Sequence, residues 1–363
     1  MARILNVISA VTPAGGTVTK LRALMLNSKK HQHLLYHPGF KSNENIINEE
    51  FDWYAKHNIT AYYKIYGRNI IKNVLEINRI IKRHKIDIVH FYFNHEQTFA
   101  GLVRLFNPKV KLVRSIVGYD HKLSIIRRTL LNTSLSYIKN YIYISQYIKE
   151  LYETDYPKLK NKNTTIIYNG PVNVSKDISP LKDRINLVST GGLCARKNQR
   201  VIIEAMNILV NHMGYKNLQL QLIGEGPLMD DYASMIHNYC LNNNVTLVGR
   251  TNNVSSYLNR CSIYLHPATT EGFGIAVTEA MFMGCACIVA DKGALPELIN
   301  DKCGIVVSHD NPHKWADAIK SLISNPSIRI KMGEEAHQRA INNFSLSTFI
   351  NKHEEYYSNL LLK

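Results

Sequence analysis

The chain alternates short apolar runs with amphipathic stretches, and it does so in two successive series. The first series opens with the apolar run Ile4–Ala10, a turn that contains glycine, and a helical pattern over Thr17–Leu26. An apolar run followed by a helix is the pattern of a βα unit, and repeated βα units build a parallel sheet covered by helices. The alternation therefore predicts the α/β class, with Rossmann-like domains.

A polar segment that contains two prolines, residues 171–184, separates the two series and has the composition of a linker. We therefore expect an N-terminal Rossmann-like domain over 1–170 and a second over 185–345. We also expect a C-terminal helix over 346–363 that packs back on the first domain. Two such domains imply a cleft between them, because open parallel sheets bind ligands at the carboxyl ends of their strands.

The periodicity also predicts the positions of individual elements. In the first domain we expect strands at 86–90, 111–117, 141–145 and 166–168, and helices at 71–84 and 146–153. In the second domain we expect strands at 186–190, 218–223, 245–248, 263–266 and 285–290, and helices at 198–210, 228–240, 275–283 and 315–323.

Charge is concentrated in the first domain. Residues 1–170 contain 26 Lys/Arg and 11 Asp/Glu, a net charge of +15, whereas residues 171–363 contain 18 and 17, a net charge of +1. A basic domain attracts anions such as nucleic acid, an anionic membrane surface or a phosphorylated substrate, although a solvated basic surface without a partner is the simpler alternative. No nucleic-acid-binding motif accompanies the charge, so a nucleic-acid partner is not expected.

Composition also excludes several classes of protein. The hydrophobic fraction of 45% and the charged fraction of 20% are those of a folded globular chain. No apolar run reaches about 18 residues, so no transmembrane helix is expected. The N-terminal apolar run suits a buried strand better than a signal peptide, which predicts a cytoplasmic protein. None of the six cysteines lies in a C-x-x-C pair, and Cys285 and Cys287 have the apolar neighbours of small buried residues.

The segment from Glu271 to Glu279 carries the clearest chemical signal. It lies between a predicted strand and a predicted helix. Gly272 and Gly274 allow a close approach to a ligand, and the N–H groups that open the following helix favour a phosphate. Eight residues of helix span about 12 Å. That length is comparable with the reach from the ribose of a nucleotide to a sugar that it carries.

This segment, within Pro267-Ala-Thr-Thr-Glu-Gly-Phe-Gly-Ile-Ala-Val-Thr-Glu-Ala-Met281, resembles the E-x7-E signature of a large family of retaining glycosyltransferases. The family, glycosyltransferase family 4, is typified by sucrose synthases and by bacterial polysaccharide and lipopolysaccharide transferases. The resemblance implies the GT-B fold, in which two Rossmann-like domains face each other across a cleft. Further similar elements occur in the same order: Ile167–Gly170, Leu222–Leu228, Val248–Arg250 and Gly293–Glu297.

The resemblance assigns roles to residues of the C-terminal domain, which would bind the nucleotide sugar. Glu271 would stabilise positive charge at the anomeric carbon, and Lys197 would bind the diphosphate, so these two are the expected catalytic residues. Glu279 would accept hydrogen bonds from the ribose hydroxyls, as a carboxylate does well. The other donor-binding residues that it implies are Arg196, Gly224, Arg250, Gly272, Phe273 and Gly274, together with Gly15 and Gly16 of the N-terminal domain.

The sequence departs from the family pattern at two positions. Gly192 stands where the family usually has an arginine, and Arg196 could supply the missing charge. Val117 stands where the family commonly has a histidine, and His121 could act in its place. For the acceptor side, in the N-terminal domain, the candidates are His90, His95 and His121.

The reaction that the resemblance implies is transfer of a hexosyl or N-acetylhexosaminyl group, with retention, from a UDP- or GDP-sugar. UDP is the favoured nucleotide, and the acceptor would be a glycan carried on a lipid diphosphate in bacterial O-antigen, capsular or lipopolysaccharide biosynthesis. The absence of an Asp-x-Asp motif predicts that no metal or other cofactor is needed.

The basic first domain predicts a peripheral position on the inner face of the plasma membrane. The stretch Lys122–Leu131 could rest on an anionic surface or be an ordinary amphipathic helix. The alternative functions are a nucleotide-sugar epimerase or phosphorylase on the same scaffold and, more remotely, nucleic-acid binding.

Overall fold

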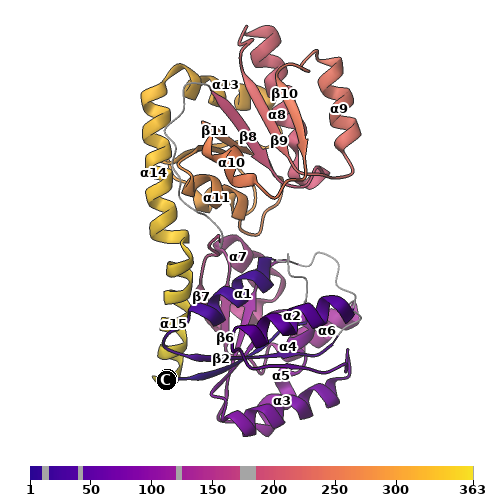
Figure 1. Cartoon of the computed structure of the whole chain (residues 1–363). Helices are drawn as coiled ribbons and strands as arrows, with labels where there is room; N and C mark the ends of the chain where they lie inside the picture. Colours follow the sequence, from indigo (N-terminus) through magenta and orange to yellow (C-terminus); the bar gives the residue numbers. More distant parts are fainter. Residues whose placement is uncertain (10–15, 40–43, 120–124, 172–184, 363) are drawn as a thin grey trace. The chain divides into compact units, whose positions relative to one another are not determined.

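The computed structural model describes residues 1–9, 16–39, 44–119, 125–171 and 185–362. The chain divides into two compact units, each built on one parallel sheet with helices on both of its faces (Figure 1). Unit 1 comprises Met1–Val172 and Leu346–Lys363, and unit 2 comprises Asn173–Ser345. The predicted α/β class, with two Rossmann-like domains, is confirmed.

Unit 1 contains a seven-stranded sheet in the order β3-β2-β1-β4-β5-β6-β7. All its pairings are parallel, and β1 lies between β2 and β4, where the chain reverses its direction across the sheet. Every residue of β4 and of β6 is buried, as in sheets covered on both faces. The strands are β1 (Arg3–Val7), β2 (Gln32–His37), β3 (Ala61–Tyr63), β4 (Ile88–Phe91), β5 (Lys111–Ile116), β6 (Asn140–Tyr143) and β7 (Asn163–Ile166).

Local sequence signals explain where several helices of unit 1 begin. The side chain of Asn69 caps α3 by accepting a hydrogen bond from the backbone N–H of Lys72, and Ser145 caps α7 in the same way. Lys85 ends α3 in the left-handed conformation. The helices are α1 (Gly16–Asn27), α2 (Glu44–Lys56), α3 (Ile70–His84), α4 (Asn94–Gln97), α5 (Ala100–Phe106), α6 (Ile125–Ser134), α7 (Gln146–Asp155), the 3₁₀ turn η1 (Pro157–Asn161) and α15 (Leu346–Leu362).

α15 follows unit 2 in the sequence but belongs to unit 1. The carboxylate of Glu354 fixes it by accepting hydrogen bonds from the backbone N–H groups of Lys29 and Lys30, at 2.5 and 2.8 Å. Its apolar face closes the core over β1, β4, β5 and β6 through Phe349, Ile350, Tyr357 and Leu360. Part of the core of unit 1 therefore comes from the end of the chain.

Unit 2 contains a six-stranded parallel sheet in the order β10-β9-β8-β11-β12-β13. The chain reverses its direction across this sheet between β8 and β11. The strands β8 and β11 begin and end where the sequence predicts. The strands are β8 (Asn186–Thr190), β9 (Gln219–Ile223), β10 (Val245–Gly249), β11 (Ile263–His266), β12 (Ala286–Ala290) and β13 (Gly304–Val307).

The helices of unit 2 cover both faces of its sheet (Figure 1). Cys285 and Cys287 are buried beside or within β12, as expected for small structural residues. In the part of the chain that the structure describes, no helix combines the length and the apolar character needed to cross a membrane. The helices and turns are η2 (Ala195–Lys197), α8 (Gln199–Asn207), η3 (Ile208–His212), α9 (Met229–Asn238), α10 (Val254–Asn259), α11 (Ile275–Phe282), α12 (Leu295–Leu298), α13 (Pro312–Ser324) and α14 (Pro326–Phe344).

Candidate active site

Two loops at the carboxyl end of the sheet of unit 2 carry the residues that the sequence singles out. Lys197 follows β8 in the turn η2, and Glu271 lies in the loop between β11 and α11. Because β8 and β11 flank the point where strand order reverses, both loops open at the usual ligand position of a parallel sheet. The fold thereby brings together two residues that are 74 positions apart in the sequence.

Glu271 is surrounded by cationic and hydrogen-bonding groups. Its Oε1 accepts a hydrogen bond from Lys197 Nζ, and the same oxygen lies 3.4 Å from Arg196 Nη1 and 3.3 Å from His266 Nε2. The side chains of Glu271 and Lys197 are 13% and 15% exposed, whereas that of Arg196 is 52% exposed. The two expected catalytic residues therefore form a largely buried ion pair, with Arg196 on its solvent side.

The carboxyl group of Glu271 is held in its ionised form. Burial raises its pKa, but the hydrogen bond from His266 and the positive charge of Lys197 outweigh burial and lower the pKa to about 2. Glu271 is therefore an anion at physiological pH. In this state it can stabilise positive charge on a bound group, but it has no proton to donate as a general acid.

His266 is a site residue that the sequence reasoning does not identify. It is the last residue of β11 and is buried, and its Nδ1 lies 3.2 Å from the hydroxyl of Tyr264. That hydroxyl in turn lies 2.8 Å from Thr190 Oγ1. Burial lowers the pKa of His266, so the ring is neutral and can donate from Nε2 to Glu271 while accepting at Nδ1. The one sequence signal is its position at a strand end, five residues before Glu271.

The backbone of Glu271 packs closely against the loop that follows β12. The N–H of Ala294 donates to the carbonyl of Glu271 at 2.9 Å. Gly293 has a φ of 62°, and a Cβ at this position would overlap the carbonyl oxygen of Glu271 and lie 2.6 Å from its nitrogen. Glycine is therefore needed here both for its conformation and for the close approach. The loop that begins at Gly293 supports the position of Glu271.

Gly224, predicted to bind the donor, is required by the fold itself. It has a φ of 142°, and a Cβ there would overlap the carbonyl oxygen of Gly191. A Cβ at Gly226 would overlap the carbonyl of Leu193, whose N–H donates to the carbonyl of Glu225 at 3.0 Å. The loops after β8 and β9 thus pack backbone against backbone. This packing accounts for both glycines, and a donor contact at Gly224 stays a prediction.

The side chain of Phe273 belongs to the core of unit 2. It is 3% exposed, and its ring packs edge-on against Phe344, with 5.8 Å between the ring centroids. This packing accounts for the ring, and a donor contact at Phe273 stays a prediction. Gly274 precedes α11 with a φ of 105°, and a Cβ there would lie 3.0 Å from Leu295 and Leu298. Its role in the fold is to let α11 start against these side chains.

The other donor-binding candidates of unit 2 lie at the same end of the sheet. Gly272 is half-buried and follows Glu271 directly. Glu279 is half-buried, one turn into α11, and its charge adds to burial in raising the pKa of Tyr264. Arg250 is exposed and comes directly after β10. Their contacts with a donor stay predictions.

The structure gives less support to the site residues predicted in unit 1. Gly15 and His121 lie outside the described residues, and Gly16 is the exposed first residue of α1. His95 is half-buried at the start of α4, with its ring 5.2 Å from that of Phe99. An acceptor role for His95 stays a prediction.

His90, the other acceptor-side candidate, lies in the core of unit 1. It is fully buried, with Nδ1 at 2.7 Å from the hydroxyl of Tyr357 and Nε2 at 2.8 Å from Ser115 Oγ. Burial holds its pKa well below the usual value for histidine. The ring joins α15 to the sheet and presents no free nitrogen to an acceptor, so the prediction for His90 is corrected here.

The lowered pKa of Glu271 predicts a specific response to acid. Its ordinary pKa is 4.5 and its pKa in the folded chain is about 2, so the ionised carboxylate stabilises the fold above pH 4.5. This stabilisation is lost as the pH falls towards 2, and it corresponds to about 3 kcal/mol. Between about pH 6 and pH 2, the free energy of unfolding should therefore fall by about 3 kcal/mol less in a Glu271→Gln variant than in the wild type.

Urea denaturation followed by circular dichroism at each pH measures this difference. Glu334→Gln, a change at an exposed glutamate of α14, is the matched control and should behave like the wild type. Equal acid sensitivity of Glu271→Gln and the wild type would contradict the lowered pKa.

Two family models match the chain, one in each half. Residues 16–171 match the model described as Glycosyltransferase Family 4, and residues 173–339 match the model described as Glycosyl transferases group 1. Within the described residues, no group of three or more His, Cys, Asp or Glu side chains is arranged to hold a metal ion.

Individual relatives and structures agree with these models. The chain is 26% identical over 319 residues to an uncharacterized glycosyltransferase of Methanocaldococcus jannaschii, with 84% of each chain covered. It is 25% identical over 284 residues to the N-acetylgalactosamine-N,N'-diacetylbacillosaminyl-diphospho-undecaprenol 4-alpha-N-acetylgalactosaminyltransferase of Campylobacter jejuni, with 73% of this chain and 75% of that protein covered.

Among solved structures, Anabaena HepE in complex with UDP has the same fold, with a TM-score of 0.79 and 16% identity over 99% of this chain and 100% of that chain. Both halves of the chain therefore carry glycosyltransferase sequence, and both of its units have the corresponding architecture. The chain is a GT-B glycosyltransferase with a family 4 N-terminal domain and a group 1 C-terminal domain.

Proposed function

We propose that this glycosyltransferase moves a hexosyl or N-acetylhexosaminyl group from a nucleotide sugar, a UDP-sugar in preference to a GDP-sugar, to a glycan acceptor on a lipid diphosphate. Transfer retains the configuration at the anomeric carbon. The observation that carries the proposal is the largely buried pair of Glu271 and Lys197, where the strand order of unit 2 reverses. Such a position suits a ligand that combines a sugar with a diphosphate.

The charges of this cluster suit an anionic leaving group. Glu271 is ionised, His266 is neutral, and Lys197 and Arg196 each carry a positive charge, so the cluster has a net charge of +1. The negative charge of Glu271 neutralises one of the two positive charges, and the other is available to a bound diphosphate. Arg196, which is half exposed and stands four residues after Gly192, is the cation with more freedom to turn towards it.

The proposed reaction takes place on one face of the donor sugar. The bond from the anomeric carbon to the phosphate oxygen breaks, the departing oxygen takes the proton of the acceptor hydroxyl, and the acceptor oxygen bonds on the same face. Glu271 stabilises the positive charge at the anomeric carbon, and Lys197 stabilises the departing diphosphate. Glu279 binds the ribose. No step requires a metal ion.

Three observations support the choice of nucleotide and acceptor. HepE, which shares the fold, was solved with UDP. The name of the Campylobacter relative specifies a diphospho-undecaprenol acceptor. The net charge of +15 over residues 1–170 suits an anionic acceptor and a position at the inner face of the plasma membrane. On this basis we propose a role in O-antigen, capsular or lipopolysaccharide biosynthesis.

A donor screen tests the proposal. The protein is incubated with UDP- and GDP-sugars, each with and without a lipid-diphosphate glycan, and the release of nucleotide is followed. We expect UDP release that depends on the acceptor, and an α-linked product from an α-linked donor, read from the anomeric coupling constant by NMR. Donor consumption without any acceptor would favour an epimerase, consumption that needs only inorganic phosphate would favour a phosphorylase, and a β-linked product would exclude retention.

A further inference from the structure

Unit 1 exposes a set of apolar side chains on α3, α5 and the segment after α6. Single exposed apolar residues are ordinary on protein surfaces, but a contiguous set marks an interaction site. The six residues are between 37% and 71% exposed, and we refer to them as the α3–α5 face: Ile71, Leu75, Leu102, Leu105, Phe106 and Tyr137.

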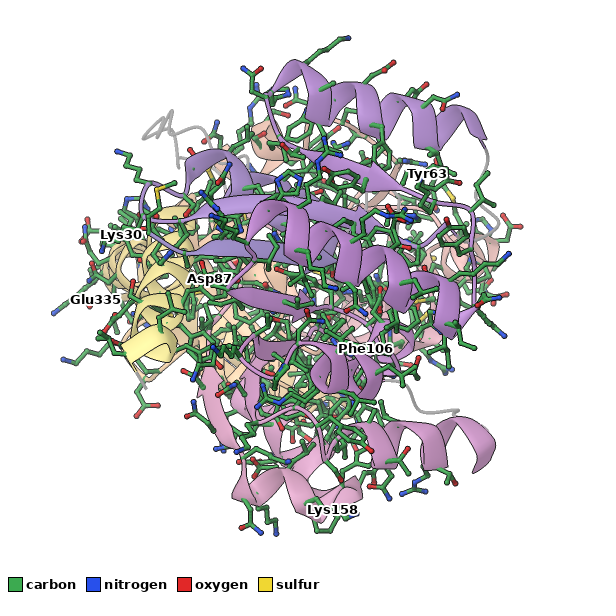
Figure 2. All side chains as sticks on the ribbon, turned by 90° about the horizontal axis from the view of Figure 1, so that it is seen from below. Lys30, Tyr63, Asp87, Phe106, Lys158 and Glu335 are labelled. Carbon is green, nitrogen blue, oxygen red and sulfur yellow. The ribbon has the colours of Figure 1, made fainter. Side chains whose placement is uncertain are left out.

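The residues of the α3–α5 face belong to elements that lie side by side. α3 and α5 are in contact, and the side chain of Asn107, directly after α5, donates to Asn78 Oδ1 of α3 at 2.5 Å. The ring of Tyr137 lies against α5, since a Cβ at Gly101 would be 3.1 Å from it. Figure 2 looks onto this side of unit 1, with Phe106 labelled at the end of α5.

The core of unit 1 does not need these side chains. α5 buries Ala100 and Val103 on its inner side, whereas Leu102, Leu105 and Phe106 are exposed. This short helix is therefore apolar on both sides. A surface helix of a globular domain usually has polar residues on its outer side, so the exposed apolar side chains of α5 point to a second apolar environment.

The segment that contains α3 and α5 is rich in basic side chains and poor in exposed acidic ones. Between residues 64 and 119, all of which the structure describes, the chain has 11 Lys/Arg and three acidic residues. Of the three, Glu76 and Glu96 are buried and Asp87 is half-buried. The exposed basic residues on or next to the two helices are Arg68, Lys72, Arg79, Lys82, Arg83, Lys85 and Lys109, of which Arg79 forms an ion pair with Glu76.

We propose that the α3–α5 face docks on the surface of an anionic lipid bilayer. Leucine, isoleucine and phenylalanine side chains enter the boundary between headgroups and acyl chains, while the basic side chains of the same segment interact with anionic headgroups. A second copy of the chain is a poorer partner, because two faces of the same positive charge repel each other. The inference deepens the proposed function, which places the acceptor on a lipid, but it rests on side chains outside the candidate active site.

Vesicle binding by apolar variants is the first test. The full-length protein is mixed with vesicles of phosphatidylcholine and phosphatidylglycerol, and the bound fraction is measured by flotation. The triple variant Leu75→Ser/Leu105→Ser/Phe106→Ser should lose most of its binding. The matched control is Ile328→Ser/Ile330→Ser on α14 of unit 2, where the side chains are 53% and 49% exposed, and it should bind like the wild type.

Basic variants test the electrostatic part. Lys72→Gln/Lys82→Gln/Arg83→Gln should bind phosphatidylglycerol vesicles about a hundredfold more weakly, because each base near such a surface contributes roughly fivefold in affinity. Raising the salt concentration to about 1 M should weaken wild-type binding, since the screening length falls to about 3 Å. The control is an equal loss of charge from exposed lysines of unit 2: Lys314→Gln, Lys320→Gln and Lys331→Gln.

The outcomes separate this inference from the proposed function. Donor turnover with a detergent-solubilised acceptor and no vesicles should be the same in the wild type and both triple variants. Wild-type vesicle binding by either triple variant, or equal binding to pure phosphatidylcholine, would overturn the docking surface whatever the turnover. A wild type that sediments as a dimer, with the apolar variant a monomer, would show instead that the face joins two copies. Loss of turnover in the donor screen with vesicle binding intact would overturn only the proposed function.

Discussion

Replacing Glu271 by alanine should lower kcat by about two to three orders of magnitude while nucleotide binding persists. The substitution removes the ionised carboxylate that we place beside the anomeric carbon, and losing one preorganised electrostatic group of an active site typically costs a factor of about 10² to 10³. Lys197 and Arg196 remain available for the diphosphate, so the affinity for UDP should be largely kept. Nucleotide release at saturating donor measures kcat, and calorimetry measures UDP binding.

Two further variants sharpen this test. Glu271→Gln keeps the size of the side chain and removes its charge, so it should lose nearly as much activity as the alanine variant. Lys197→Ala should lower both kcat and the affinity for UDP, because it removes a diphosphate contact. Glu334→Ala on α14 is the control for a lost surface carboxylate. If Glu271→Ala and Lys197→Ala both turned over at the wild-type rate, the proposed mechanism would be wrong.

Replacing Gly293 by alanine should both destabilise unit 2 and lower turnover. The new Cβ would lie 2.6 Å from the nitrogen of Glu271 and overlap its carbonyl oxygen, and both atoms belong to backbone that cannot swing aside. The positive φ adds strain of about 1 kcal/mol. We expect a total loss of about 3 kcal/mol or more in the free energy of unfolding. Because the clash displaces the loop of Glu271, kcat should fall as well.

Gly214→Ala is the matched control for this prediction. Gly214 also has a positive φ, of 81°, but no atom lies within 4 Å of the position of its Cβ. Alanine there should cost only the backbone strain of about 1 kcal/mol and leave turnover unchanged. Urea denaturation gives both free energies. Similar losses at the two glycines would show that contact with the backbone of Glu271 is unimportant.

The fold was predictable where apolar runs are long and regular. β8 and β11 consist of buried residues between clear turns, so their bounds follow from the sequence. β2 is missed because its buried positions include histidines, which a hydropathy pattern counts as polar. β3 has only three residues, and β13 is a four-residue edge strand, so neither gives a detectable period. The strand expected at 166–168 lies three residues earlier, over Asn163–Ile166.

The site was predictable only as far as it is local in the sequence. Glu271 and Glu279 occur in one continuous segment, whereas the contact of His266 with Glu271 depends on how a strand end meets the following loop. The burial of the Phe273 ring was not predictable, because a residue between two glycines can point either to a ligand or to the core. The stretch Lys122–Leu131 was a membrane candidate by composition. Its residues 122–124 lie outside the described residues and Leu131 is buried, so a membrane role for this stretch stays a prediction, separate from the surface that we propose on α3 and α5.

The position of α15 has a consequence for the order in which the protein is made. β1 and α1 leave the ribosome before unit 2, and Phe349 to Leu360 leave it after unit 2, yet these segments share one core. The first sheet must therefore wait, with one apolar face uncovered, while all of unit 2 is synthesised. Unit 2 is a single continuous segment and can fold as it emerges. Nascent chains thus carry an open hydrophobic surface while unit 2 is made, which is the state that chaperones recognise, and unit 1 is begun before unit 2 but completed after it.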